Sequence, residues 1–385
     1  MSLFARAPHN TPLSTQEKLD WLRLIRTQNV GPITFYNLLE YYGTAGEALR
    51  ALPDLAKKGG RKKPLVAPAP AKIEKEYEAL QKLGGDIICS GEQGYPLSLA
   101  STDDAPPVLS YIGDLNLVRA PCLAIVGARN ASLNGRKFAQ KIAKDLGQAG
   151  QVIVSGLARG IDTSAHNGAL ETGTIAVVAG GIDIIYPSEN TALYNEIKQK
   201  GLIIAESPLG MEPIARHFPK RNRIVSGLSS GVVVIEASVK SGSLITARMA
   251  GEQGRDVYAV PGYPQDPRAA GPNKLIQDGA TLVQRADDIL NALNNYTGGH
   301  VLRDSALSTP PILDVISSES PEINTENAKS SILENLSQMP LAVDELLRAC
   351  HLNIPEGQFA LLEMELAGHI QRLPGNRVVL LDTEE

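Results

Sequence analysis

The chain has 385 residues, 43% of them hydrophobic, which is enough for two or three domains with proper cores. It has no run near the ~20 apolar residues of a membrane-spanning helix, and the polar start at Met1–Thr15 lacks a signal-peptide core, so a cytoplasmic protein is expected. Three widely spaced cysteines and six scattered histidines argue against a disulfide framework and a zinc site. The net charge of −5 hides a basic centre: residues 120–255 hold 15 lysines and arginines against 10 acidic residues, whereas residues 325–385 hold 4 against 10.

The first predicted domain, residues 14–80, is helical. Apolar residues recur at helical spacing from Thr15 to about Leu55, interrupted by the turn at Asn29–Pro32. Two helices around a glycine turn are typical of helix-hairpin-helix and SAM-like modules, in which the turn can present N–H groups to a phosphate. A plain αα-hairpin is an equally good interpretation. The basic run Lys57–Lys63 and the proline-rich stretch behind it are interpreted as a solvated linker, with attraction for nucleic acid as the second interpretation.

The second predicted domain, residues 84–294, alternates apolar runs with helical patterns, as in an α/β fold with a parallel, Rossmann-like sheet. The β-branched run at Val232–Ile235 is typical of a central strand that is buried on both faces. Strands are predicted at residues 86–90, 123–127, 152–155, 175–179, 202–205, 232–236 and 257–260, and near 282.

Two turns of one design open this core. Each has an apolar run, a glycine and then an arginine: Gly127 and Arg129 in the first turn, and Gly156, Arg159 and Gly160 in the second. Ligands of open α/β sheets bind at the carboxyl ends of the strands, where these turns lie. Glycine allows close approach to the backbone, helix N-termini favour phosphate, and arginine supplies a fixed fork of donors. Arg129 stands where G-x-G-x-x-G has its second glycine, which argues against a dinucleotide site.

Catalytic patterns are weak. There is no Walker A motif, and no serine lies in G-x-S-x-G. Asp162 is interpreted as a helix N-cap and His166 as a structural residue. Glu206 and Glu236 end two strands at the ligand edge and are either a carboxylate pair or, more commonly, hydrogen-bonded strand ends. We therefore expect a protein that is not an enzyme, with no catalytic, metal or cofactor site.

The stretch from Arg216 to Gly227 places Phe218 beside five residues that are cationic or nearly so. Single-stranded nucleic-acid sites combine cations for phosphates with an aromatic face for bases. The alternative is a basic loop with Phe218 in the core. The neighbouring glycine–arginine turns favour the ligand interpretation.

The C-terminal part is predicted as a linker, residues 295–325, and a winged helix, residues 326–385. Three helical patterns precede a hairpin around Pro374. The expected recognition helix carries Glu363 and Glu365 and no lysine or arginine. A protein-contact or structural role is therefore preferred to DNA binding.

Nine segments occur in one order across residues 94–290, and together they resemble the DNA-processing protein A family, DprA or Smf. The flanking helical module and winged helix resemble a three-domain member. The segments are Tyr95–Leu99, Pro106–Gly113, Ile125–Ser132, Ser155–His166, Tyr186-Pro187, Phe218–Arg223, Ser241–Ala247, Gln253–Asp256 and Val260–Gly262.

The resemblance implies a core that binds single-stranded DNA and forms a homodimer. It implies that the protein protects incoming DNA and loads the RecA recombinase onto it during natural transformation. In this role the arginines hold phosphates and Phe218 stacks on a base. The DNA-binding residues that it implies are Gly127, Arg129, Ser132, Gly156, Arg159, Gly160, Phe218, Lys220, Arg221, Asn222 and Arg223.

Two further hypotheses belong to other classes. A nucleotide-processing enzyme of the phosphoribohydrolase (LOG-like) type would carry P-G-G-x-G-T-x-x-E, but the nearest counterpart, Ser241–Ala247, lacks the glutamate. A scaffolding protein would use the sheet only to dimerise.

Overall fold

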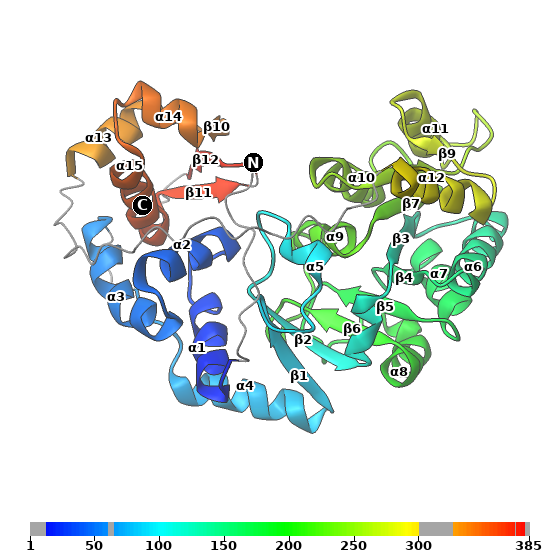
Figure 1. The fold of residues 1–385 in the computed structure, drawn as a ribbon, viewed down its shortest axis with the longest axis horizontal. Helices are drawn as coiled ribbons and strands as arrows, with labels where there is room; N and C mark the ends of the chain where they lie inside the picture. The colour runs from blue at the N-terminus through cyan, green and yellow to red at the C-terminus, as the bar shows by residue number, and fades with distance from the viewer. Residues whose placement is uncertain (1–12, 61–64, 300–325, 374, 382–385) are drawn as a thin grey trace. The chain divides into compact units, whose positions relative to one another are not determined.

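The computed structural model describes residues 13–60, 65–299, 326–373 and 375–381, which form two compact units (Figure 1). The first unit contains the described residues up to Thr27, residues 31–49 and residues 67–289. The second unit contains the described residues of the ranges 28–30, 50–66 and 290–381. The helical start of the chain is therefore divided between the two units. Within the described ranges, no helix combines the length and apolarity that crossing a membrane requires.

The first unit is built on a nine-stranded sheet with the order β1-β2-β6-β5-β4-β3-β7-β8-β9. The strands from β6 to β9 in this order are parallel, and β2 and β1 continue the sheet in antiparallel pairing. The strands are β1 (Gly85–Cys89), β2 (Val108–Gly113), β3 (Cys122–Gly127), β4 (Val152–Ser155), β5 (Thr174–Val178), β6 (Leu202–Ala205), β7 (Gly231–Ile235), β8 (Asp256–Ala259) and β9 (Thr281–Leu282). The predicted parallel core is confirmed, and β7 is buried along its whole length.

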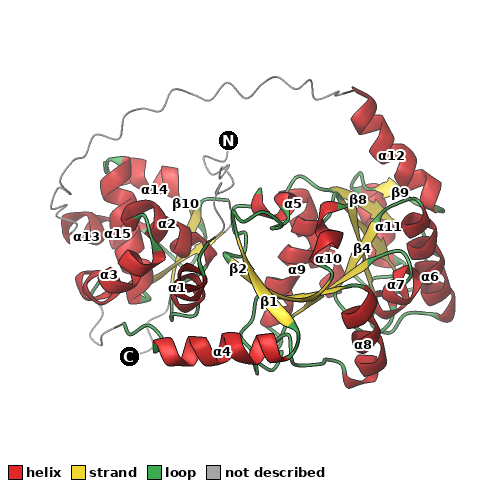
Figure 2. Cartoon of the chain, turned by 60° about the horizontal axis from the view of Figure 1, so that its bottom comes forward, coloured by secondary structure: helices red, strands yellow, loops and turns green. Residues whose placement is uncertain are grey.

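Strand order reverses between β3 and β7, because the chain runs outward from β3 to β6 and then returns to the other side of β3. Helices α6, α7 and α8 cover one face of the sheet, and α9 and α10 cover the other (Figures 1 and 2), as right-handed crossovers require. The helices of the core are α5 (Leu97–Ala100), α6 (Leu133–Gln148), α7 (Ile161–Ala169), α8 (Thr191–Lys200), α9 (His217–Leu228), α10 (Gly242–Glu252) and α11 (Ala270–Gln277).

The helices α1 (Thr15–Ile25), α2 (Pro32–Tyr42) and α4 (Pro70–Lys82) belong to the first unit. Lys18 forms an ion pair with Glu92 at 3.0 Å. Arg26 donates to the carbonyl oxygen of Glu206 at 3.0 Å. These contacts fasten α1 to loops beside the antiparallel edge of the sheet.

Three local interpretations are corrected. Asp162 is not an N-cap: α7 begins at Ile161, and Gly160 is the cap with φ at 78°. The stretch from His217 to Leu228 is helix α9, so the basic loop that was the alternative interpretation of this stretch is wrong. Helix α12 (Ala286–Gly299) includes the first residues of the expected linker, and residues 300–325 lie outside the described ranges.

The second unit contains the winged helix, which is confirmed. Its three strands follow the order β10-β12-β11, and Pro374 of the predicted hairpin lies outside the described residues. The winged helix consists of α13 (Glu326–Asn335), β10 (Leu341–Ala342), α14 (Val343–Ala349), α15 (Ile354–Ala367), β11 (Ile370–Leu373) and β12 (Arg377–Leu380). The ends of α3 (Ala45–Lys58) and α12 belong to the same unit.

Helix α15 is the counterpart of a recognition helix, and two of its three carboxylates, those of Glu363 and Glu365, are buried. Glu363 pairs with Lys329 at 2.9 Å, and Glu365 lies 3.8 Å from Arg372. Lys329 also donates to the carbonyl oxygen of Lys58 at the end of α3. Glu363 and Glu365 are therefore internal ion-pair partners, which agrees with the structural role that was one of the two preferred from the sequence.

Candidate nucleic-acid interface

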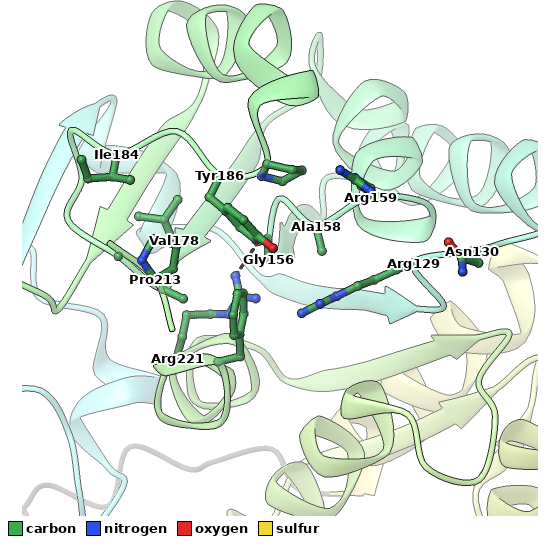
Figure 3. Close-up of a pocket in the computed structure, with 14 residues that line it drawn as sticks. Arg129, Asn130, Gly156, Ala158, Arg159, Val178, Ile184, Tyr186, Pro213 and Arg221 are labelled. Carbon is green, nitrogen blue, oxygen red and sulfur yellow. Dashed lines mark hydrogen bonds between the residues drawn. The ribbon is translucent and has the colours of Figure 1, made fainter. Parts of the chain in front are cut away.

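A pocket of about 200 Å³ opens at the carboxyl ends of β3, β4 and β5. Its walls come from the two glycine–arginine turns, the loop after β5 and the start of α9 (Figure 3). The lining residues are Arg129, Asn130, Gly156, Ala158, Arg159, Val178, Ala179, Gly180, Ile184, Tyr186, Pro187, Pro213, Phe218 and Arg221. The position agrees with the general rule for ligands of open α/β sheets.

Two aromatic rings and an arginine converge at this pocket. The guanidinium carbon of Arg129 lies 4.8 Å from the centroid of the Phe218 ring. The Tyr186 ring lies 5.8 Å from the Phe218 ring at a tilt of 55°, and Tyr186 is 48% exposed. Figure 3 shows Arg129, Tyr186 and Arg221 pointing toward one another. The arrangement combines a cation with aromatic faces that a planar ligand can contact.

Arg221 places a second positive charge at the floor of the pocket. Its side chain is buried and donates to the carbonyl oxygens of Gly156 and Val177. Burial lowers the pKa of Arg221 to about 10, the nearby Asp162 opposes this shift, and the charge of Arg129 adds to it. The guanidinium therefore stays protonated at neutral pH, where it can attract an anion.

The second turn is shaped around Arg221. A Cβ atom at Gly156 would lie 2.5 Å from a guanidinium nitrogen of Arg221, so glycine makes room for that group. The Asp162 carboxylate accepts from the backbone N–H groups of Gly156 and Ala158, at 3.2 and 3.3 Å. Burial raises the pKa of Asp162, while Arg221 and these two N–H groups act in the opposite direction.

Five of the predicted DNA-binding residues meet in this pocket. Arg159 stands at its rim, where it forms an ion pair with Glu189. The side chain of Arg159 is 60% exposed, so solvent weakens this pair and leaves the arginine accessible. The five are Arg129, Gly156, Arg159, Phe218 and Arg221.

Two predicted glycines act as packing positions of the turns and do not line the pocket. A Cβ atom at Gly127 would lie 1.8 Å from the carbonyl oxygen of Ile235. At Gly160, φ is 78° and a Cβ atom would lie 2.3 Å from the carbonyl oxygen of Ala128. Both glycines let the two turns pack closely against their neighbours.

Three residues predicted from the basic stretch lie elsewhere on α9. Lys220 is exposed. The Asn222 amide donates to the carbonyl oxygen of Gly242 at 3.4 Å. Arg223 is buried, pairs with Glu206 and lies 3.6 Å from Asp104. The Glu206 carboxylate is thus a strand-end ion-pair partner.

Ser132 also lies outside the pocket. Its hydroxyl caps α6 by accepting from Gly135 N–H at 2.9 Å, and it donates to the carboxylate of Glu236. Sequence reasoning missed Tyr186 as a site residue, although the Tyr186-Pro187 pair was among the matching segments. Tyr186 could have been predicted, because the loop after β5 lies at the same sheet edge as the two arginine turns.

The predicted structural role of His166 agrees with its position under the second turn. Its Nδ1 lies 2.7 Å from the Thr174 hydroxyl, which itself donates to the carbonyl oxygen of Ile153. Nδ1 must therefore carry the proton, and Nε2 is a buried acceptor without a hydrogen-bond partner among the described residues. Burial, helped by the charge of Arg221, lowers the pKa of His166 to about 3.

This histidine predicts a loss of stability in mild acid. Between its ordinary pKa of 6.5 and the folded value, the unfolded chain binds one proton more than the folded chain. The free energy of unfolding should therefore fall by up to about 1.4 kcal/mol per pH unit as the pH drops through this window. Urea titrations from pH 7.5 to 5 on the parent and on His166→Gln measure this effect. The stability difference between the two should shrink toward acid, and a constant difference would contradict the assignment.

The fold and the site define a Rossmann-like domain with a cationic and aromatic pocket at the carboxyl edge of its sheet. Residues 86–294 match the model of the DNA recombination-mediator protein A family. Residues 15–79 match a DprA-like N-terminal HHH domain, and residues 317–376 match a DprA winged helix domain. The chain therefore belongs to the DNA recombination-mediator protein A family. The N-terminal match favours the helix-hairpin-helix interpretation over a plain αα-hairpin.

Relatives carry the names DprA and Smf. Protein Smf of Escherichia coli is 37% identical over 80% of this chain and 81% of its own length. DNA processing protein DprA of Streptococcus pneumoniae is 46% identical over 51% of this chain and 70% of its own.

Two solved structures are also similar. DNA processing protein A of Streptococcus pneumoniae matches with a TM-score of 0.63 and 37% identity, over 73% of this chain and 98% of the other. The Helicobacter pylori protein, described for its single-stranded DNA binding mode, matches with a TM-score of 0.51 and 31% identity. That match covers 55% of this chain and 96% of the other.

Proposed function

We propose that the core binds single-stranded DNA in the pocket between the two arginine turns and α9. The observation that carries the proposal is the position of Arg129 over the Phe218 ring, with the Tyr186 ring beside it. Bases stack on such rings only when they are splayed out of a duplex, and arginines hold the phosphates between them. The Helicobacter pylori relative, described for its single-stranded DNA binding mode, supports the same ligand.

We also propose that binding occurs without catalysis. Among the described residues that line the pocket there is no carboxylate, histidine, serine or cysteine, so the lining offers no nucleophile–base pair. The further proposed role is to protect incoming strands during natural transformation and to load RecA recombinase onto them. The proposed assembly is a homodimer through the core. The family's description as a recombination mediator supports this role.

Fluorescence anisotropy with labelled oligonucleotides tests the ligand. Single strands should bind more tightly than the matching duplex, and log K should fall linearly with log salt between about 50 and 200 mM, because phosphate contacts release counterions. Lys144→Ala, which removes an exposed charge outside the pocket lining, is the control and should bind as the parent does. Equal or tighter binding of duplex would contradict the proposal.

A further inference from the structure

A single residue at the end of the neighbouring strand forms hydrogen bonds with both ends of the turn that contains Arg129. We propose that Glu236 is the positioning residue that aims Arg129 into the DNA pocket. The inference rests on the proposed function for its DNA readout, and it has a second readout that does not need DNA.

Glu236 directly follows β7, which lies beside β3 in the sheet with Ile235 opposite Gly127. The carbonyl oxygen of Glu236 accepts from Ala128 N–H at 2.6 Å, where the turn begins. Its carboxylate accepts from Ser132 N–H at 2.7 Å and from the Ser132 hydroxyl, where the turn ends. Backbone and side chain of one residue thus hold the segment Ala128–Ser132, and Arg129 is the second residue of that segment.

The local geometry is built around this carboxylate. Glu236 has φ at 48°, a left-handed conformation that is costly for a non-glycine residue and persists only where the surroundings enforce it. On the other side, a Cβ atom at Gly135 would lie 2.6 Å from the carboxylate, so glycine in the first turn of α6 leaves the space that the carboxylate fills.

The carboxylate also occupies the N-terminus of α6, where α/β proteins often bind a phosphate. Ser132 and Glu236 line a separate hollow, and neither lines the pocket that contains Arg129 and Phe218. The carboxylate of Glu236, an anion of the protein itself, thus already accepts the hydrogen bond from Ser132 N–H. Of this turn, Arg129 and Asn130 line the pocket, and Arg129 supplies the positive charge there. Glu236 acts through Arg129 and not by touching DNA.

The test is a double-mutant cycle with Glu236→Gly and Arg129→Ala. Glycine suits φ at 48° and keeps the backbone acceptor, so the change removes the side chain with its carboxylate and leaves the backbone contact to Ala128. Glu236→Gly should weaken single-strand binding about tenfold, as loss of a charged hydrogen bond does, and lower the salt slope by about one. Arg129→Ala should lower the affinity and the salt slope by the same amounts. The double variant should bind single strands as tightly as Arg129→Ala does. Additive losses, or parent-like binding by Glu236→Gly, would overturn the inference.

The Nε–H signal of Arg129, measured by NMR on protein without DNA, is the second readout. The Phe218 ring should shift this signal in the parent, and Glu236→Gly should abolish the shift, whereas Glu236→Gln should keep part of it. If the Arg129 Nε–H signal of Glu236→Gly has the same shift as in the parent, the positioning role of Glu236 is wrong, whatever the DNA data show. If the shift collapses while the parent binds no single strands, the proposed function fails and the positioning role stands.

Gly135→Ala tests the same contact without changing charge. The added methyl group takes the space of the Glu236 carboxylate, so DNA affinity and the Arg129 signal should change in the direction of Glu236→Gly. Gly251→Ala is the matched control, because Gly251 lies in helix α10 and its Cβ position is open. Parent-like behaviour of Gly135→Ala in both readouts would count against the positioning role.

Discussion

Phe218→Ala should weaken single-stranded DNA binding by about 5- to 150-fold, because a stacked base contributes roughly 1–3 kcal/mol. The ring stands beside both Arg129 and Tyr186, so its removal takes away the central face of the pocket. The loss should be nearly independent of salt, since Phe218 carries no charge and releases no counterion.

The salt dependence separates stacking from phosphate contact. Arg129→Ala should lower the slope of log K against log salt by about one, whereas Phe218→Ala should leave the slope unchanged. Phe218→Tyr keeps an aromatic face and should retain most of the affinity. Parent-like binding by Phe218→Ala, or a slope that falls as it does in Arg129→Ala, would remove Phe218 from the proposed stacking role.

Glu363→Ala should destabilise the winged helix by about 3–5 kcal/mol, because it removes the carboxylate that pairs with the buried ammonium group of Lys329, while the contact of this group with the carbonyl oxygen of Lys58 remains. The side chains of Lys329 and Glu363 are 9% and 1% exposed, so water cannot replace the lost contact easily. Amide hydrogen exchange of residues 326–367, followed by mass spectrometry on the full chain, measures the local free energy of opening.

Two variants show whether charge burial causes this loss. The double variant Lys329→Met with Glu363→Leu removes both charges and should be close to the parent in stability. Glu334→Ala removes an exposed carboxylate from the same helix as Lys329 and should change stability by less than about 0.5 kcal/mol. A single Glu363→Ala variant with parent-like protection would show that the pair contributes nothing.

Much of the fold was predictable because its signals are local. Apolar runs such as Val232–Ile235 become buried strands in any parallel sheet. The helical pattern between the two arginine turns becomes α6. The start of α7 was wrong by two residues, because Asp162 resembles a cap but its carboxylate binds the backbone of the preceding turn.

The place of the pocket at the sheet edge was predictable, but the set of residues that line it was not. Phe218 and Arg221 are three residues apart in helix α9 and both face the pocket. Arg223, on another side of that helix, is buried against Glu206 and Asp104. A run of adjacent basic residues resembles one binding surface in the sequence, but a helix distributes such residues over different faces.

The sequence by itself determined the parallel α/β class, the two arginine turns, the aromatic–basic stretch and the winged helix, because each depends on neighbouring residues. Only the tertiary structure decided which of these residues share a pocket, since helix faces and strand order select them. The opening turn shows the difference most clearly. The arginine of this turn was evident from the sequence. Glu236, which accepts from Ser132 of the same turn, lies 104 residues further along the chain, and the two meet only because β7 lies beside β3 in the sheet.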